Sequence, residues 1–354
     1  MRVLVTGSEG SLMQWVIPHL IEEGYELVGV DNFSRYGQVD RKRDYEFFRR
    51  DLTDQKAVKE VCKGVNAIIQ AAAQIYGVRG FHKFPADILS RDILLHQNLL
   101  REAVERKMTR MVYISSSMVY ERAKQIPVRE EDVNEMQIPL TDYGLSKLVG
   151  ERLCKAFKQQ YDLDYTIWRP FNIITPYEKA GDESGMSHVF ADFIQKIIIN
   201  KQMPMEILGD GEQVRCFTWI DDVASAIAKF SFLDSTRCEV FNLGNPEPVT
   251  MKELSKRIFD KAKQKGIIPN KTKLAFVHKL IYDDDVRIRV PSIEKAQSVL
   301  NWKPRVTLDE ALNRCITAAL AWDGSDARYR RKDTDKENAR LSGNSAQSTV
   351  HMKE

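Results

Sequence analysis

Tyr143 and Lys147 are residues whose types and spacing suit acid–base chemistry. They lie four residues apart, so a helix through this segment would place both side chains on one face. A nearby ammonium lowers the pKa of a phenol, and we therefore expect Tyr143 to act as a general base near neutral pH. Pairs of this kind are also common on ordinary amphipathic helices, so the spacing alone does not identify a base.

A run of serines follows the apolar segment 111–115, which predicts a buried strand. The run reads Ser115-Ser116-Ser117 and continues into Met118-Val119-Tyr120. Hydroxyl side chains are an unusual choice for the end of a buried strand unless they face a polar ligand. We therefore expect this strand end to border the same ligand site as Tyr143.

A glycine-containing loop near the N-terminus resembles a phosphate-binding turn. It runs from Thr6 through Gly7 and Gly10 to Met13, between a predicted strand and a predicted helix. Glycines there let the backbone approach a pyrophosphate, and the helix start offers unpaired N–H groups. Asp31, at the end of the second predicted strand, can accept hydrogen bonds from ribose hydroxyls and would repel a 2′-phosphate. The pattern favours NAD over NADP.

Short apolar segments alternate with amphipathic segments along the first half of the chain. Predicted strands cover residues 3–6, 26–30, 67–71, 111–115 and 165–168. Predicted helices cover residues 15–23, 88–106, 145–160, 189–199, 221–230, 251–264 and 308–322. The alternation predicts an α/β protein with a doubly wound parallel sheet of the Rossmann type.

The pattern divides the chain into three parts. Residues 1–170 are expected to form a dinucleotide-binding domain, to which segments of the second half return. Residues 171–322 are expected to form a smaller mixed α/β lobe, with the ligand site in the cleft between the two. Residues 323–354 are charged and polar with few large apolar side chains, which predicts a disordered tail.

The bulk composition excludes several classes of protein. The chain has 354 residues, of which 43% are hydrophobic, and no apolar run long enough to span a membrane. Its five cysteines are scattered, which argues against a disulfide framework or a metal site and favours a reducing, cytoplasmic compartment. The net charge of +3 is too small and dispersed to indicate a nucleic-acid partner.

The order of these motifs resembles that of extended short-chain dehydrogenases/reductases, in the NAD-dependent nucleotide-sugar epimerase/dehydratase family. The resemblance covers about residues 1–322. It implies that NAD is contacted by Gly7, Glu9, Gly10, Ser11, Leu12, Asp31, Asn32, Asp51, Leu52, Ala71, Ala72, Ala73, Tyr143, Lys147 and Pro170. The family usually has a small residue at the Met13 position, so Met13 implies a slightly displaced first helix.

The resemblance also assigns the reacting and substrate-contacting residues. Ser116 falls on the family's catalytic Ser/Thr position, and Tyr143 and Lys147 fall on its catalytic pair. Tyr143 would take the proton of a sugar 4-hydroxyl while hydride leaves C4 for NAD, giving a bound 4-keto sugar. The substrate, a nucleoside-diphosphate sugar, would be contacted by Ser117, Asn172, Arg215 and Arg289, the last replaceable by Arg287.

Three reactions share this 4-keto intermediate. Dehydratases and decarboxylases of the family carry an acidic residue just after the catalytic Ser/Thr, where this chain has Ser117 and Met118. We therefore predict a 4-epimerase, with a 4,6-dehydratase or uronic-acid decarboxylase as the alternative. A non-catalytic NAD-binding regulatory protein is the alternative of another class. Glu121 is expected to be a solvated loop residue, although its carboxylate could support dehydration.

The family resemblance also bears on assembly. In this family two helices of each subunit pair across a two-fold axis, and here they would be the predicted helices near residues 88–106 and 143–160. Their long apolar faces agree with such pairing, although burial in the subunit core would explain them equally well. The resemblance implies a homodimer formed through a four-helix bundle.

Overall fold

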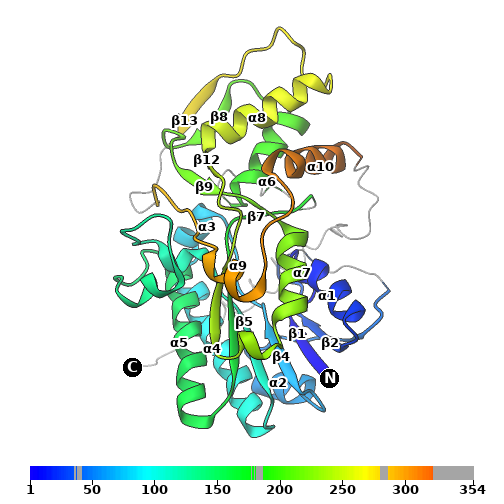
Figure 1. Cartoon of the computed structure of the whole chain (residues 1–354). Helices are drawn as coiled ribbons and strands as arrows, with labels where there is room; N and C mark the ends of the chain where they lie inside the picture. Colours follow the sequence, from blue (N-terminus) through cyan, green and yellow to red (C-terminus); the bar gives the residue numbers. More distant parts are fainter. Residues whose placement is uncertain are drawn as a thin grey trace, which may run out of the picture.

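A parallel sheet fills the lower half of the molecule in Figure 1, and a smaller group of helices and short strands lies above it. The computed structural model describes residues 1–35, 37, 42–176, 178, 180, 186–279 and 286–321. Within them the sheet has seven strands in the order β11-β6-β5-β4-β1-β2-β3. Their bounds are β1 (Arg2–Thr6), β2 (Glu26–Asp31), β3 (Glu46–Arg49), β4 (Ala67–Gln70), β5 (Arg110–Ile114), β6 (Tyr165–Pro170) and β11 (Glu239–Leu243). The predicted parallel α/β sheet is confirmed.

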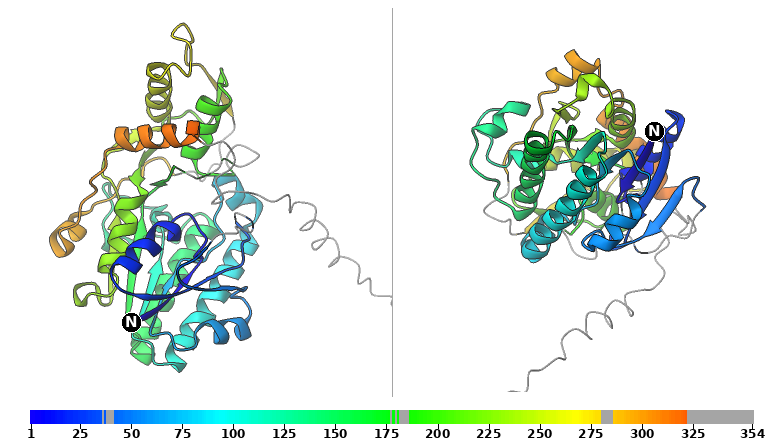
Figure 2. Two further views of the ribbon diagram at one scale, coloured as in Figure 1. Left: turned by 90° about the vertical axis from the view of Figure 1, so that its right-hand side faces the viewer. Right: turned by 90° about the horizontal axis from the view of Figure 1, so that it is seen from below.

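Helices cover both faces of the sheet. One face carries α2 (Gln55–Val61), α4 (Pro85–Glu105) and α5 (Asp142–Tyr161), and the other carries α1 (Met13–Glu22), α7 (Ile220–Phe230) and α9 (Glu294–Leu300). The central strands are mostly apolar, with polar residues at their ends, because both of their faces are buried. Figure 2 shows α4 and α5 side by side in the view from below.

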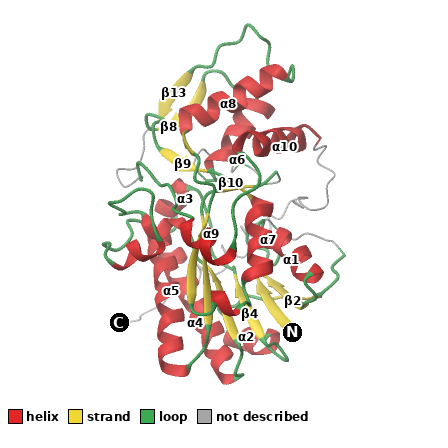
Figure 3. Cartoon of the chain, viewed as in Figure 1, coloured by secondary structure: helices red, strands yellow, loops and turns green. Residues whose placement is uncertain are grey.

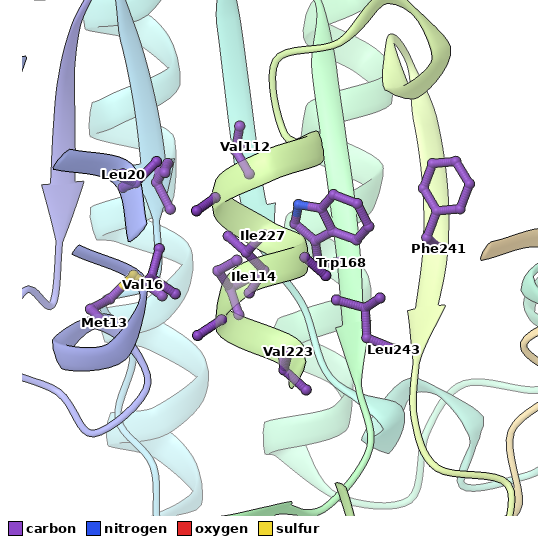
Figure 4. Close-up of a cluster of buried hydrophobic side chains, with 14 of the residues drawn as sticks. Met13, Val16, Leu20, Val112, Ile114, Trp168, Val223, Ile227, Phe241 and Leu243 are labelled. Atoms are coloured by element: carbon purple, nitrogen blue, oxygen red, sulfur yellow. The ribbon is translucent and has the colours of Figure 1, made fainter. Parts of the chain in front are cut away.

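Alternate residues of β1 supply the cores on the two faces. Leu4 packs under α4, whereas Val3 and Val5 pack under α1 and α7. Met13, the first residue of α1, is 1% exposed and belongs to the second of these cores together with Val223. Figure 4 shows Met13 on the side of α1 that faces α7. The large Met13 side chain is therefore accommodated by core packing.

The smaller lobe packs around its own apolar core, which includes Phe193, Ile197, Leu254 and Leu312. Its helices are α6 (Val189–Ile194), α8 (Met251–Gln264) and α10 (Leu308–Ala321), and its strands form the pairs β7 (Ile173–Ile174) with β10 (Thr218–Trp219), β8 (Met205–Leu208) with β13 (Phe276–Lys279), and β9 (Val214–Cys216) with β12 (Pro248–Thr250). The predicted helix 189–199 is α-helical only to Ile194 and then continues as a π-helical turn (Gln195–Ile199). Figure 3 shows that the helices and short strands of the smaller lobe lie apart from the large sheet.

Four short helices complete the described structure, namely α3 (Val78–Lys83), η1 (Ser117–Tyr120), η2 (Glu130–Asn134) and η4 (Asp234–Thr236). Segments from the second half return to the sheet, because β11 extends its edge while α7 and α9 cover one face. The predicted disordered tail, 323–354, lies outside the described residues. Among the helices that the structure describes, none is long and apolar enough to cross a membrane.

Candidate active site

A cavity of about 410 Å³ opens where the carboxyl ends of β1, β4, β5 and β6 meet the smaller lobe. This is the position in which open α/β sheets bind ligands. The cavity brings together segments that are up to 282 residues apart in the sequence, from Gly7 to Arg289. Every site residue predicted from the sequence lines it, with the exception of Glu9.

Glu9 lies behind the cavity wall. Its carboxylate accepts hydrogen bonds from Arg43 Nε at 3.0 Å and from the Tyr45 hydroxyl at 3.2 Å. Its backbone N–H donates to Asp31 Oδ2 at 3.0 Å. The Glu9 backbone therefore holds Asp31 in place, and the predicted contact of Glu9 with NAD stays a prediction.

The glycine loop is shaped for close approach of a ligand to the backbone. Gly7 has a φ of +64°, and a Cβ on it would lie 3.0 Å from the Cα and N atoms of Ala72. The Gly10 N–H donates to the Gly7 carbonyl at 2.9 Å and closes the turn. Thr6 Oγ1 accepts from the N–H groups of Ala71 and Ala72, each at 3.1 Å, which holds the two strand ends together. These residues fit the pyrophosphate of a dinucleotide.

The two aspartates that are predicted to contact the adenosine of NAD, Asp31 and Asp51, both line the cavity. Asp31 accepts hydrogen bonds from the Phe33 N–H at 2.7 Å and from the Glu9 N–H. Burial raises the pKa of the Asp31 carboxyl in spite of these bonds. Burial also acts to raise the pKa of Asp51, but hydrogen bonds from Thr53 and the charge of Arg91 outweigh it and leave that pKa below its usual value. Both carboxylates are held in fixed orientations.

Ser116, Tyr143 and Lys147 meet beside the end of β5. Ser116 directly precedes η1, and its hydroxyl accepts the Met118 N–H at 3.1 Å. Tyr143 lies in the first turn of α5, which begins after the capping residue Thr141. Lys147 follows one turn later, 5.7 Å from the centre of the Tyr143 ring, and donates to the Ile114 carbonyl at 3.1 Å. The shared helix face predicted from the sequence thus borders the serine-rich strand end.

The electrostatics of Tyr143 differ from the sequence-based expectation. Burial raises the pKa of the phenol well above its ordinary value, while a hydrogen bond from Ser116 and the charges of Arg289 and Arg35 oppose the rise. The expected lowering is therefore wrong for the protein alone, because removal of water outweighs the neighbouring positive charges. Burial also lowers the pKa of Lys147.

The predicted substrate residues gather at the other end of the cavity. The backbone N–H of Arg289 donates to the Val214 carbonyl at 3.1 Å, which brings Arg289 beside Arg215. Arg289 Nη2 also donates to Asn172 Oδ1 at 3.2 Å. Arg287 instead donates to both carboxylate oxygens of Asp210, at 2.8 and 2.9 Å, and does not line the cavity. Of the two neighbouring arginines, Arg289 is the one that lines the cavity.

Glu121 is buried, contrary to the expectation of a solvated loop residue. It is 6% exposed and borders the cavity between η1 and α5. One oxygen accepts the Thr141 backbone N–H and the other accepts the Thr141 hydroxyl, each at 2.7 Å. Burial raises the pKa of this carboxyl. Because both oxygens bind the capping residue of α5, Glu121 supports the helix that carries Tyr143.

The sequence did not single out an acid–imidazole pair that also lines the cavity. His188 Nδ1 lies 2.5 Å from Glu178 Oε1. The negative charge of Glu178 raises the pKa of His188. Burial acts to raise the pKa of Glu178, but the positive charge of His188 outweighs burial, so the pKa of Glu178 is lowered. The hydroxyls of Thr175 and Ser187 border the same region, buried and without a hydrogen-bond partner among the described residues. A histidine within a glycine-containing loop is the one sequence signal that could have drawn attention to the pair.

Comparison with known proteins identifies the family of this chain. Residues 3–244 match the model of the NAD-dependent epimerase/dehydratase family. The chain belongs to this family. It is 30% identical to a putative UDP-glucose 4-epimerase of Methanocaldococcus jannaschii, over 89% of this chain and 97% of that protein. It is 28% identical to a UDP-glucuronate 4-epimerase of Thermodesulfobacterium geofontis, over 88% of this chain and 94% of that protein.

Solved structures show the same relationship. The chain superposes on the UDP-glucose 4-epimerase of Thermotoga maritima with a TM-score of 0.76 and 27% identity, over 90% of this chain and 98% of that one. Relatives at 26–27% identity also include UDP-glucuronic acid decarboxylases. The protein is therefore an NAD-dependent enzyme of the nucleotide-sugar epimerase family. The contacts of the glycine loop, Asp31 and Asp51 with NAD stay a prediction.

Proposed function

We propose that the protein is a nucleotide-sugar 4-epimerase. The observation that carries the proposal is the continuity of one cavity between the group Ser116, Tyr143 and Lys147 and the pair Asn172 and Arg289. A sugar diphosphate bound at the second group would extend its hexose toward the first. Arginine suits the diphosphate because its planar guanidinium binds phosphate oxygens in pairs.

The residues at the first group support oxidation at C4. The Ser116 hydroxyl would hydrogen-bond the 4-hydroxyl of the sugar, and Tyr143 would take its proton. When bound, the nicotinamide cofactor would supply the hydride acceptor in its oxidised form and the hydride donor in its reduced form. Lys147 would hold a positive charge that stabilises the phenolate form of Tyr143, which becomes a phenol when it takes the proton. Ser117 lies next to this site and would bind another hydroxyl of the sugar.

The surroundings of C4 favour epimerisation over elimination. Met118 cannot transfer a proton, and the carboxylate of Glu121 is occupied by Thr141. The second candidate is a dehydratase or decarboxylase of the same family, because the Glu178–His188 pair could exchange protons within the same cavity. A non-catalytic NAD-binding protein is the remaining alternative, and the assembled Ser116, Tyr143 and Lys147 speak against it.

The mass of the product separates these functions. We would incubate the protein and NAD⁺ with UDP-glucose, UDP-N-acetylglucosamine, UDP-glucuronate and a GDP-hexose in turn. A C4 epimer of unchanged mass is expected from at least one of them, and Tyr143→Phe should form none. A product lighter by one water or one carbon dioxide would identify a dehydratase or decarboxylase instead. Activity unaffected by Tyr143→Phe would contradict any role of this site.

We also propose a homodimer in a cytoplasmic compartment. The packed pair α4 and α5 leaves Leu94 and Tyr161 exposed, at 44% and 46%, as expected for helices that pair with a second copy. All five cysteines are free thiols, which suits a reducing environment. Light scattering should give twice the mass of one chain, and a monomer with unchanged activity would contradict the dimer.

A further inference from the structure

Asp92 is a buried carboxylate on α4 that the proposed reaction does not use. It is 8% exposed and lies where α4 packs against α5. Oδ1 accepts the Gln74 backbone N–H at 2.9 Å, and Oδ2 lies 3.4 Å from the Ser146 hydroxyl. A buried carboxylate is costly unless hydrogen bonds and an opposite charge compensate it. The hydrogen-bond donors and positive charges near Asp92 therefore indicate its role.

The hydrogen bonds of Asp92 lead to the reacting tyrosine. The Ser146 hydroxyl that faces Asp92 also donates to the backbone carbonyl of Tyr143 at 2.9 Å. Gln74 belongs to the segment after β4 that lines the cavity. Asp92 therefore joins three parts of the active site, namely α4, the first turn of α5, and the cavity wall after β4.

The charge of Asp92 also interacts electrostatically with that of Lys147. Burial raises the pKa of Asp92 to about 6, and Lys147 is the foremost group opposing that rise. In return, Asp92 is the foremost group that keeps Lys147 charged against its own burial, with Glu151 next. The negative charge of Asp92 also raises the pKa of Tyr143. The Asp92 carboxylate thus affects the pKa values of both Tyr143 and Lys147.

We propose that Asp92 is a positioning residue, which fixes the first turn of α5 through Ser146 and supplies the negative charge that balances Lys147. The inference rests on the proposed function, because it concerns the pair that would carry the proton of the sugar. Without this charge, the charged form of Lys147 would lose the larger of the two carboxylate contributions that favour it, and the Tyr143 phenol would ionise more readily.

Other charged and titratable groups face the same residues and must stay in place during a test. They are Arg91 on α4, Glu151 on α5, Tyr113 on β5, Tyr76 after β4, Arg35 after β2, and Arg289 of the smaller lobe. The substitution Asp92→Asn leaves all of them unchanged. Its amide oxygen can accept from Gln74 and its NH₂ can donate to the Ser146 hydroxyl, so the hydrogen bonds are kept while the charge is removed.

The pH dependence of turnover tests the effect on Tyr143. Asp92→Asn should lower the pKa of Tyr143 and so move the rising limb of the kcat profile to lower pH by about one unit. This is the size of shift expected when one nearby charge is removed. Asp92→Ser, a second neutral variant, should move it in the same direction. Ser146→Ala keeps the charge and should lower kcat with the limb in place. If the rising limb of the kcat profile lies at the same pH in Asp92→Asn and Asp92→Ser as in the parent protein, the inference is overturned.

A titration of Asp92 itself needs no turnover and so separates this inference from the proposed function. In the NAD-loaded protein labelled with ¹³C at the aspartate carboxyl, the Asp92 signal is the one lost in Asp92→Asn. Its midpoint should lie near pH 6 and rise by at least about one unit in Lys147→Met. Lys155→Met, on the same helix, should leave it unchanged. An Asp92 midpoint that is equal with and without Lys147 would overturn the pairing, whatever sugar the enzyme accepts.

Discussion

The ring of Phe81 lies flat against the ring of Tyr143, with centroids 4.7 Å apart and planes 6° apart. Phe81 belongs to α3, and the segment before that helix is tied to the smaller lobe by a bond from the Gly77 N–H to the Met186 carbonyl at 3.0 Å. The stack removes water from one face of the phenol. The basicity of Tyr143 is therefore set partly by a segment outside its own helix.

Replacing Phe81 by Leu should ease the burial of Tyr143 and lower the pKa of its phenol. The rising limb of the kcat profile should then move to lower pH, and the lost stacking should reduce the free energy of unfolding by about 1 kcal/mol. Phe84→Leu is the control, because Phe84 packs on Tyr76. A limb that moves to higher pH in Phe81→Leu would show that burial by this ring is not what raises the pKa.

Loss of the Glu121 carboxylate should loosen the start of α5. Glu121→Ala removes both bonds to Thr141, and charged hydrogen bonds of this kind are worth about 1.5–3 kcal/mol each. We expect a lower free energy of unfolding in urea and a lower kcat at unchanged KM. Glu121→Gln keeps one acceptor and should recover part of both losses. If Glu121→Ala unfolds like the parent protein, the carboxylate does not support the helix.

Substitutions of the two neighbouring arginines, Arg287 and Arg289, should differ in their effect on KM. Arg289→Gln should raise KM for the nucleotide sugar roughly 10- to 100-fold, because a charged hydrogen bond to phosphate is worth about 1.5–3 kcal/mol. Arg287→Gln should leave KM unchanged, since Arg287 binds Asp210 at the surface. Isothermal titration with UDP gives the same comparison without turnover. Equal losses in both variants would contradict the assignment.

The raised pKa of Asp92 predicts a specific dependence of stability on pH. Its folded pKa of about 6 lies above the ordinary value of 3.8, so the folded protein binds the proton more tightly than the unfolded chain. Stability from this group is present below pH 4 and is lost as pH rises through 6, by about 3 kcal/mol in total. The free energy of unfolding of Asp92→Asn, relative to that of the parent protein, should therefore rise by about that amount between pH 4 and pH 7. Urea unfolding at both pH values measures the gain, and a constant difference would refute it.

Local patterns in the sequence determined the parallel sheet, the glycine loop and the pairing of Tyr143 with Lys147. Periodicity identifies a buried strand or an amphipathic helix without knowledge of its neighbours, and two residues four apart on one helix are near each other in any fold. The helix over 251–264 matches α8 for the same reason. The order of motifs along the chain then identified the family.

Tertiary structure decided how the site residues behave. Burial depends on segments that are distant in sequence, so no local pattern could show that Glu121 is covered or that Phe81 shields Tyr143. The sequence favoured Arg289 but left Arg287 as a replacement, and the bond of Arg287 to Asp210 in the folded chain distinguishes the two. The sequence by itself determined which groups are present for the chemistry. Their pKa values and availability follow from the removal of water, which only the packed structure defines.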